Sequence, residues 1–122
     1  MLDRRHRLTS SAGFSSATRR GRRAGSSTLV VHLQENVGGD PAVGEPRVGL
    51  VVARSVGKAV TRNRVRRRLR HLVRERLASL PPCSVLVVRA LPPAVTASYD
   101  ALGGDLDSAL RRARGAGTGR RR

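Results

Sequence analysis

Apolar positions between residues 59 and 80 recur with the period of a helix, and they set the first expectation about the fold. Val65, Leu69, Leu72, Val73 and Leu77 fall within about 140° of one face at 100° per residue. The Pro81-Pro82 pair then ends the predicted helix. A shorter helix is predicted from Thr9 to about Arg20, with Phe14 and Ala17 facing inward. A third is predicted from Ser98 to Arg114, with an inner stripe of Tyr99, Leu102, Leu106, Ala109, Leu110 and Ala113.

Three apolar runs too short for helices predict strands. They span residues 28–33, 47–53 and 84–89, and they are rich in valine and leucine. The run at 47–53 is nearly continuous, which is typical of a central strand covered on both faces. Glycines and prolines between residues 35 and 46 predict a loop, and residues 55–58 predict a turn.

The predicted order is helix, two or more strands, helix, strand, helix. This order indicates an α/β (α+β) sandwich with one small sheet and helices packed on it. The stretch from Val48 to Val88 predicts a strand–helix–strand crossover. We expect one domain over residues 1–114 and a disordered basic tail over 115–122, which contains mainly glycine and arginine.

Charge narrows the class of partner. The 122 residues include 25 Lys+Arg against 8 Asp+Glu, a formal net charge of +17, and Lys58 is the only lysine. Such a balance predicts a polyanionic partner and disfavours a secreted domain, a channel or an enzyme of small neutral substrates. Cys83 alone excludes an internal disulfide and fits a reducing cytoplasm, and no apolar stretch approaches the ~20 residues of a membrane span.

Residues 61–70 carry the sharpest motif. Six of these ten residues are arginine, yet the apolar period continues through Val65 and Leu69. A disordered tail has no reason to keep that period, so we expect a core-anchored helix with a polycationic outer face. Arg62 and Arg64 are predicted in its first turn, where a bound anion would offset the unfavourable dipole. Asn63 is either a helix cap or a group that contacts a ribose, a base edge or a metal-bound water.

The segment from Arg47 to Arg70, RVGLVVARSVGKAVTRNRVRRRLR, resembles the signature of the bacterial ribonuclease P protein component. The similarity covers roughly residues 4 to 112. It implies a left-handed crossover between parallel strands, where the sequence pattern alone favours the right-handed form. It also implies a catalytic RNA that, with Mg²⁺, removes the 5′ leader of precursor tRNA, while the protein binds both RNAs and holds neither catalytic residue nor metal.

The resemblance assigns roles residue by residue. It implies that RNA is contacted by residues of the predicted helix at 59–80 and of the turn before it, namely Arg62, Asn63, Arg64, Arg66, Arg67, Arg70, Arg54, Ser55 and Lys58. It implies that a cleft for the leader, between the first helix and the sheet, contains Phe14, Arg7 and Arg89. The sequence departs from the family at Thr18 and near His32, where aromatics are usual, and at Gly57-Lys58, where the family has Gly-Asn. We therefore expect the cleft to rely more on arginine and backbone contacts.

Two other classes of protein remain as alternatives. An autonomous nuclease would need converging carboxylates, and the close pair Asp105 and Asp107 is predicted to face solvent on a helix. His6, His32 and His71 are expected to be structural or RNA-contacting. A ribosomal or other structural RNA-binding protein shares the charge and size but not the Arg-Asn-Arg signature after a strand. We expect one protein per RNA, and neither a DNA nor a membrane partner.

Overall fold

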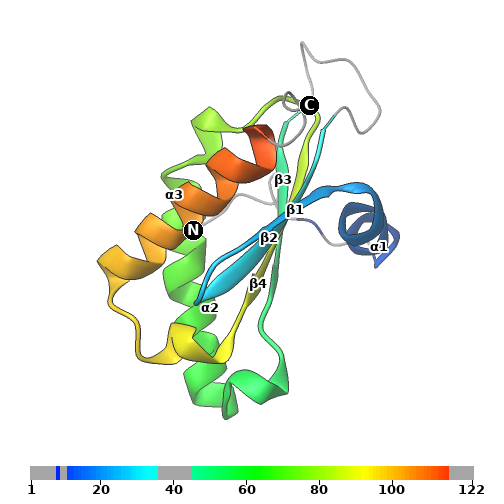
Figure 1. Ribbon diagram of the computed structural model, residues 1–122. Coiled ribbons are helices and arrows are strands. Elements are labelled where there is room, and N and C mark those ends of the chain that lie inside the picture. The colour runs from blue at the N-terminus through cyan, green and yellow to red at the C-terminus, as the bar shows by residue number, and fades with distance from the viewer. Residues whose placement is uncertain (1–7, 9–10, 36–44, 116–122) are drawn as a thin grey trace.

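The computed structural model describes Leu8 and residues 11–35 and 45–115 as three helices around one sheet (Figure 1). The helices are α1 (Ser11–Arg20), α2 (Ala59–Arg74) and α3 (Tyr99–Gly115). The strands are β1 (Arg22–Gly25), β2 (Leu29–Gln34), β3 (Arg47–Val51) and β4 (Val85–Ala90). Short 3-10 turns occupy Arg54–Val56, Leu77–Ser79 and Pro92–Val95. The element order confirms the predicted α/β class. None of the described helices combines the length and apolarity that crossing a membrane requires.

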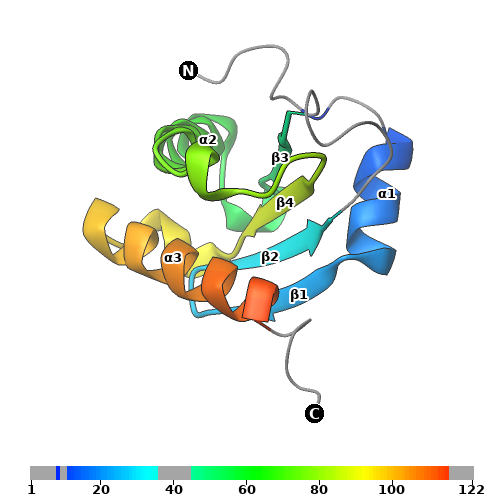
Figure 2. The same cartoon turned by 90° about the horizontal axis from the view of Figure 1, so that it is seen from above.

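The sheet has the strand order β1-β2-β4-β3 and lies between two layers of helix. β2 pairs antiparallel with β1 and with β4, while β3 and β4 are parallel. Viewed from above, α1 covers one face of the sheet, and α2 and α3 cover the other (Figure 2). Alternate residues of each strand therefore face α1 or the α2–α3 layer.

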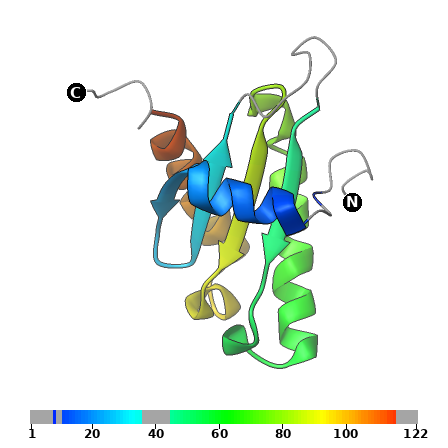
Figure 3. The same ribbon diagram turned by 90° about the vertical axis from the view of Figure 1, so that its right-hand side faces the viewer.

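The β3–α2–β4 crossover is left-handed, as the family resemblance implied. In Figure 3, β3 and β4 both run downward, β4 lies to the left of β3, and α2 lies behind the sheet. Seen from the helix side with the strands pointing up, the chain thus moves to the left. The usual handedness of such units is the opposite, so sequence periodicity alone would have placed α2 on the wrong face.

β3 lies at the edge of the sheet, and the prediction of a central strand covered on both faces is wrong for it. Val48 is buried, but Leu50 and Val51 are only half-buried. The backbone N–H of Leu8 donates to the Val48 carbonyl at 2.8 Å, which satisfies one group of this open edge. The strands with hydrogen-bonded neighbours on both sides are β2 and β4, and their apolar residues form the centre of the core.

The inner faces of α2 and α3 match the predicted stripes with two exceptions. Val65, Leu69, Leu72 and Val73 are buried, as are the predicted α3 residues Leu102, Leu106, Ala109, Leu110 and Ala113. Leu77 lies beyond the end of α2, in a 3-10 turn, and is half-buried. Tyr99 is 39% exposed, because helical side chains lean toward the N-terminus and that of a first residue projects beyond the helix.

Two contacts fix the α2–α3 layer. Arg76 follows α2 and donates from Nη1 to the Leu72 carbonyl at 2.8 Å, so its side chain satisfies a carbonyl of the last helical turn. The same guanidinium reaches Asp107 on α3. A Cβ on Gly103 would lie 3.2 Å from both Arg76 Nη2 and Leu72 Cδ2, so a glycine at this position lets the Arg76 side chain pass between the helices.

Candidate nucleic-acid interface

The α2 helix presents arginine on its outer face because its inner face is anchored in the core. It extends over 16 residues without an acidic residue. Val65 and Leu69 are at most 1% exposed, so the helix cannot rotate without exposing them. The packing of the inner face therefore fixes which residues of α2 face outward.

The predicted RNA-contacting residues of α2 lie together on this outer surface. Asn63, Arg64 and Arg67 are exposed, and Arg62, Arg66 and Arg70 are half-buried. Three arginines at i, i+4 and i+8 repel one another by a few tenths of a kcal/mol per pair in water. A polyanion bound along this stripe would turn that cost into attraction. We call Arg62, Asn63, Arg64, Arg66, Arg67 and Arg70 the α2 surface.

α2 begins too early in the chain for both Arg62 and Arg64 to lie in its first turn, as predicted. α2 starts at Ala59, so Arg62 closes the first turn and Arg64 belongs to the second. Arg64 is thus not beside the free N–H groups, and its placement there is corrected. Asn63 is not a cap, since the N-cap is Lys58. The Asn63 carboxamide oxygen instead accepts a hydrogen bond from Arg66 Nη1 at 3.0 Å, which orients that guanidinium.

One arginine of α2 serves the fold. Arg68 Nη2 donates to the Ala97 carbonyl at 2.8 Å and ties α2 to the segment before α3. Residues 66 and 68 are about 200° apart around a helix, so the stripe of Arg62, Arg66 and Arg70 lies on the flank away from α3. Arg62 keeps one structural contact, from Nε to the Gly57 carbonyl at 3.1 Å.

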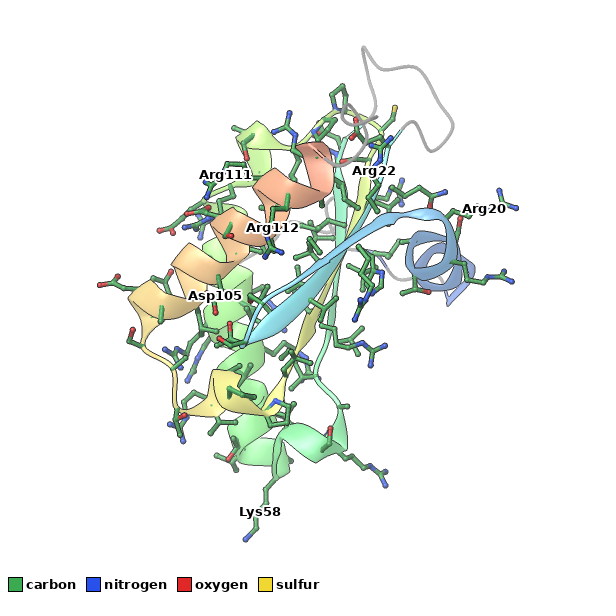
Figure 4. All side chains as sticks on the ribbon, in the orientation of Figure 1. Arg20, Arg22, Lys58, Asp105, Arg111 and Arg112 are labelled. Carbon is green, nitrogen blue, oxygen red and sulfur yellow. The ribbon has the colours of Figure 1, made fainter. Side chains whose placement is uncertain are left out.

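The turn before α2 adds three further predicted contacts. Arg54, Ser55 and Lys58 are all exposed. The side chain of Lys58 points away from the body at the end of the molecule where α2 begins (Figure 4). Gly57, with φ of 156°, makes the bend between the 3-10 turn and α2, so the turn residues extend the α2 surface past the helix N-terminus.

A second group of basic residues lies on the sheet face that α1 covers. Ala17 of α1 packs on Val85 and Val87, and the alternation of β4 places Arg89 on the same face. The register pairs Arg23 with His32, and it pairs His32 with Val87, so those residues share that face. Arg23 and Arg89 are exposed, whereas His32 is only 8% exposed.

His32 sits neutral between these arginines. Burial, with help from the charges of Arg23 and Arg89, lowers the pKa of its imidazole below the ordinary value of 6.5. Its Nδ1 is buried and has no hydrogen-bond partner among the described residues.

The predicted cleft residues are only partly brought together. Arg89 lies on the α1-facing side of the sheet, as the resemblance implied. Arg7 lies outside the described residues, and Phe14 belongs to α1, but its side chain is outside them too. Arg23 was missed, because a short polar segment gives no strand signal. Its charge beside the predicted strand at residues 28–33 was the only hint.

Asp105 and Asp107 of α3 do not form a catalytic pair, and each is bonded to another group. Asp105 accepts a hydrogen bond from the Thr28 hydroxyl at 2.6 Å. Asp107 accepts two from Arg76, at 2.5 and 3.1 Å, and this bonding lowers the pKa of the Asp107 carboxyl. The prediction that these acids face solvent is confirmed for Asp107, which is exposed despite its bonds to Arg76, but it is wrong for Asp105, which is half-buried. Within residues 11–35 and 45–115, no three His, Cys, Asp or Glu side chains converge as a metal site would require.

Known proteins with similar sequences identify the family of this chain. The family model described as Ribonuclease P matches residues 2–114. A Ribonuclease P protein component of Nocardioides sp. is 58% identical over 113 residues, which cover 92% of this chain and 94% of that protein. One from Streptomyces griseus is 52% identical over 96% of this chain and 98% of its own length.

Solved structures share the fold. The RNase P protein of Staphylococcus aureus superposes with a TM-score of 0.75 at 21% identity, covering 89% of this chain and 95% of that one. The RNase P protein of Thermotoga maritima gives 0.72 at 24% identity, covering 87% and 96%. At these identities the likeness establishes the arrangement of helices and strands alone.

Proposed function

The chain belongs to the ribonuclease P protein family, and on that premise we propose that its α2 surface holds a catalytic RNA while the α1-facing side of the sheet holds the 5′ leader of precursor tRNA. As a member of that family it is the protein subunit of a tRNA-processing ribonuclease P. The alternative of a ribosomal or other structural RNA-binding protein finds no support in the comparisons.

One observation carries the proposal for α2. A 16-residue helix without acids keeps its arginines on the outside by burying Val65, Leu69, Leu72 and Val73. Arginine offers planar forks of donors that match phosphate geometry. A rigid array of such groups fits a folded RNA with phosphates at defined positions, whereas a loose basic tail would bind any polyanion through counterion release.

In this proposal the RNA, together with Mg²⁺, performs the chemistry. The described residues do not fit a Mg²⁺ site belonging to the protein. Asp105 and Asp107 are engaged by Thr28 and Arg76, while Glu35 and Glu75 lie beside Arg22 and Arg76. We therefore assign no step of the reaction to a protein-held metal. What the arginines supply is charge, which lets phosphates of RNA and substrate approach one another with less free Mg²⁺.

The α1-facing side of the sheet supplies the substrate contacts. Arg23 and Arg89 flank the neutral His32 there, and α1 forms the wall of the cleft. Both arginines are exposed and can bind the leader phosphates. This arrangement replaces part of the aromatic stacking usual in the family. One protein per RNA and a cytoplasmic location remain predictions.

The experiment is a cleavage assay at low Mg²⁺. Purified protein is added to a bacterial ribonuclease P RNA and a precursor tRNA, and the 5′ product is followed on a gel. We expect the protein to stimulate cleavage at the mature 5′ end and to cleave nothing by itself. Cleavage by the protein alone, or no stimulation at any protein concentration, would contradict the proposed function.

A further inference from the structure

Four arginines gather where α1 turns into β1, at the edge of the sheet opposite β3. Arg19 and Arg20 end α1, Arg22 and Arg23 begin β1, and only Gly21 separates the two pairs. The Gly21 N–H donates to the Ala17 carbonyl at 2.9 Å, and a Cβ at this position would lie 2.4 Å from that oxygen. The turn therefore requires glycine. We call the four arginines the corner surface.

The charges of the corner surface are largely unpaired. All four arginines are exposed. Arg22 Nη1 lies 3.4 Å from a carboxylate oxygen of Glu35, the one acidic partner of these four arginines among the described residues. The side chains of Arg19, Arg20 and Arg23 bond to none of the described residues. A hollow of about 290 Å³ lies next to Arg20 and Arg22, floored by Leu33 and Gln34.

The strand that carries half of this surface is braced from behind. Arg112 on α3 donates from Nη2 to the Gly25 carbonyl at 2.7 Å, and Asp105 accepts from the Thr28 hydroxyl. Asp105 and Arg112 both lie on α3, on the side of the molecule away from α1 (Figure 4). The β1–β2 hairpin is thus fixed before any ligand arrives, which lowers the entropic cost of binding.

The location of the corner surface says which ligand it fits. α1 crosses the sheet from the β3 side to the β1 side and ends at Arg20 (Figure 3). A single strand of RNA that follows α1 along the sheet, past Arg89 and then Arg23, arrives at the corner. The α2 surface lies beyond the opposite edge. Because the α2 surface is assigned to the catalytic RNA, the corner is left free for the leader.

We propose that the corner surface binds the phosphodiester backbone of the leader, beyond the nucleotides held between α1 and the sheet. This rests on the proposed function of the α1-facing side. Because phosphates are the same in every nucleotide, the affinity for precursor tRNA should rise with the length of the leader and should not depend on its sequence. Arg19, Arg20 and Arg22, the corner arginines outside the cleft, predict that the slope of log affinity against log salt is steeper by about 2 for a long leader.

The test compares precursor tRNAs with leaders of about 4 and about 12 nucleotides, which span the capacity of a small basic groove. Binding to the assembled holoenzyme is measured with wild-type protein, the corner variant R19Q/R20Q/R22Q, which keeps Arg23 in the cleft, and a control variant R111Q/R114Q that removes charge from α3 instead. We expect the long leader to bind roughly tenfold tighter than the short one at about 50 mM salt. We expect only the corner variant to lose this advantage and the added salt dependence.

Other outcomes separate the two levels of inference. If the holoenzyme cleaves normally but leader length has no effect, or the control variant loses the advantage equally, the corner surface does not bind the leader. If the corner variant weakens assembly with the catalytic RNA and leaves the length advantage intact, the assignment to the leader is wrong. Circular dichroism of each variant checks that α1 and the sheet remain folded. Failure to stimulate cleavage with any leader would overturn the proposed function itself.

Discussion

Replacing Asp107 with asparagine should destabilise the fold in a pH-dependent way. The Asp107 carboxylate accepts two hydrogen bonds from Arg76, which also bonds to the Leu72 carbonyl and so fixes the end of α2 to α3. The side chains of Arg76 and Asp107 are 21% and 49% exposed, so solvent screens the pair. A bidentate pair of this exposure contributes about 1 kcal/mol, which corresponds to roughly 4 °C in the melting temperature.

The sign of the pH dependence follows from the pKa of the Asp107 carboxyl, which Arg76 holds below its ordinary value. The stabilisation that the Asp107–Arg76 pair gives the fold is complete above the unfolded-state pKa of the carboxyl, near 4. It is lost as the pH falls through the folded-state pKa. Thermal unfolding of wild-type protein and D107N, followed by circular dichroism, should therefore differ at pH 7 and converge as the pH falls below the folded-state pKa of the Asp107 carboxyl. An equal difference at every pH, or no difference at pH 7, would refute the reasoning. The double variant R76Q/D107N should be no less stable than R76Q.

Three further changes test the packing and the buried histidine. Gly104→Ala should raise the free energy of unfolding in urea by about 0.5–1 kcal/mol, because nothing lies within 4 Å of the added methyl. Gly103→Ala should give a less stable protein than Gly104→Ala, because its methyl meets Arg76. The reverse order of stability would contradict this packing. Leu69→Ala should cost about 2–5 kcal/mol, since Leu69 is fully buried, and a loss well under 1 kcal/mol would show that α2 is not core-anchored. The wild-type protein should lose stability as the pH falls from about 7.5 to about 5, because His32 takes up a proton near pH 6.5 when unfolded but resists protonation when folded. His32→Gln should reduce this loss. An unchanged dependence of stability on pH would count against a buried, neutral His32.

The helices were predictable because their inner faces are simple. Leu69 and Leu106 recur with neighbours at helical spacing, and both are fully buried. The polycationic face of α2 followed from the same periodicity. The helix ends were less accurate, because α2 stops at Arg74 through a bond that the Arg76 side chain makes to Leu72, which periodicity does not encode.

The sheet was harder to predict because its order depends on contacts far apart in sequence. A near-continuous apolar run is typical of a central strand, yet β3 lies at the edge, and its outer residues are covered only in part. β1 has one buried apolar residue, Ala24, and forms through pairing with β2. The basic face around Arg23 and His32 exists only once this pairing is made.

The most direct test of the account is the affinity of the protein for the catalytic RNA at several salt concentrations. The variant R62Q/R66Q/R70Q keeps the buried face of α2, and the control R111Q/R114Q removes charge from α3 instead. If the α2 surface holds the RNA, only the first variant should bind weakly, with a slope of log affinity against log salt shallower by about 3. Equal affinities and equal slopes for the two variants would contradict the account.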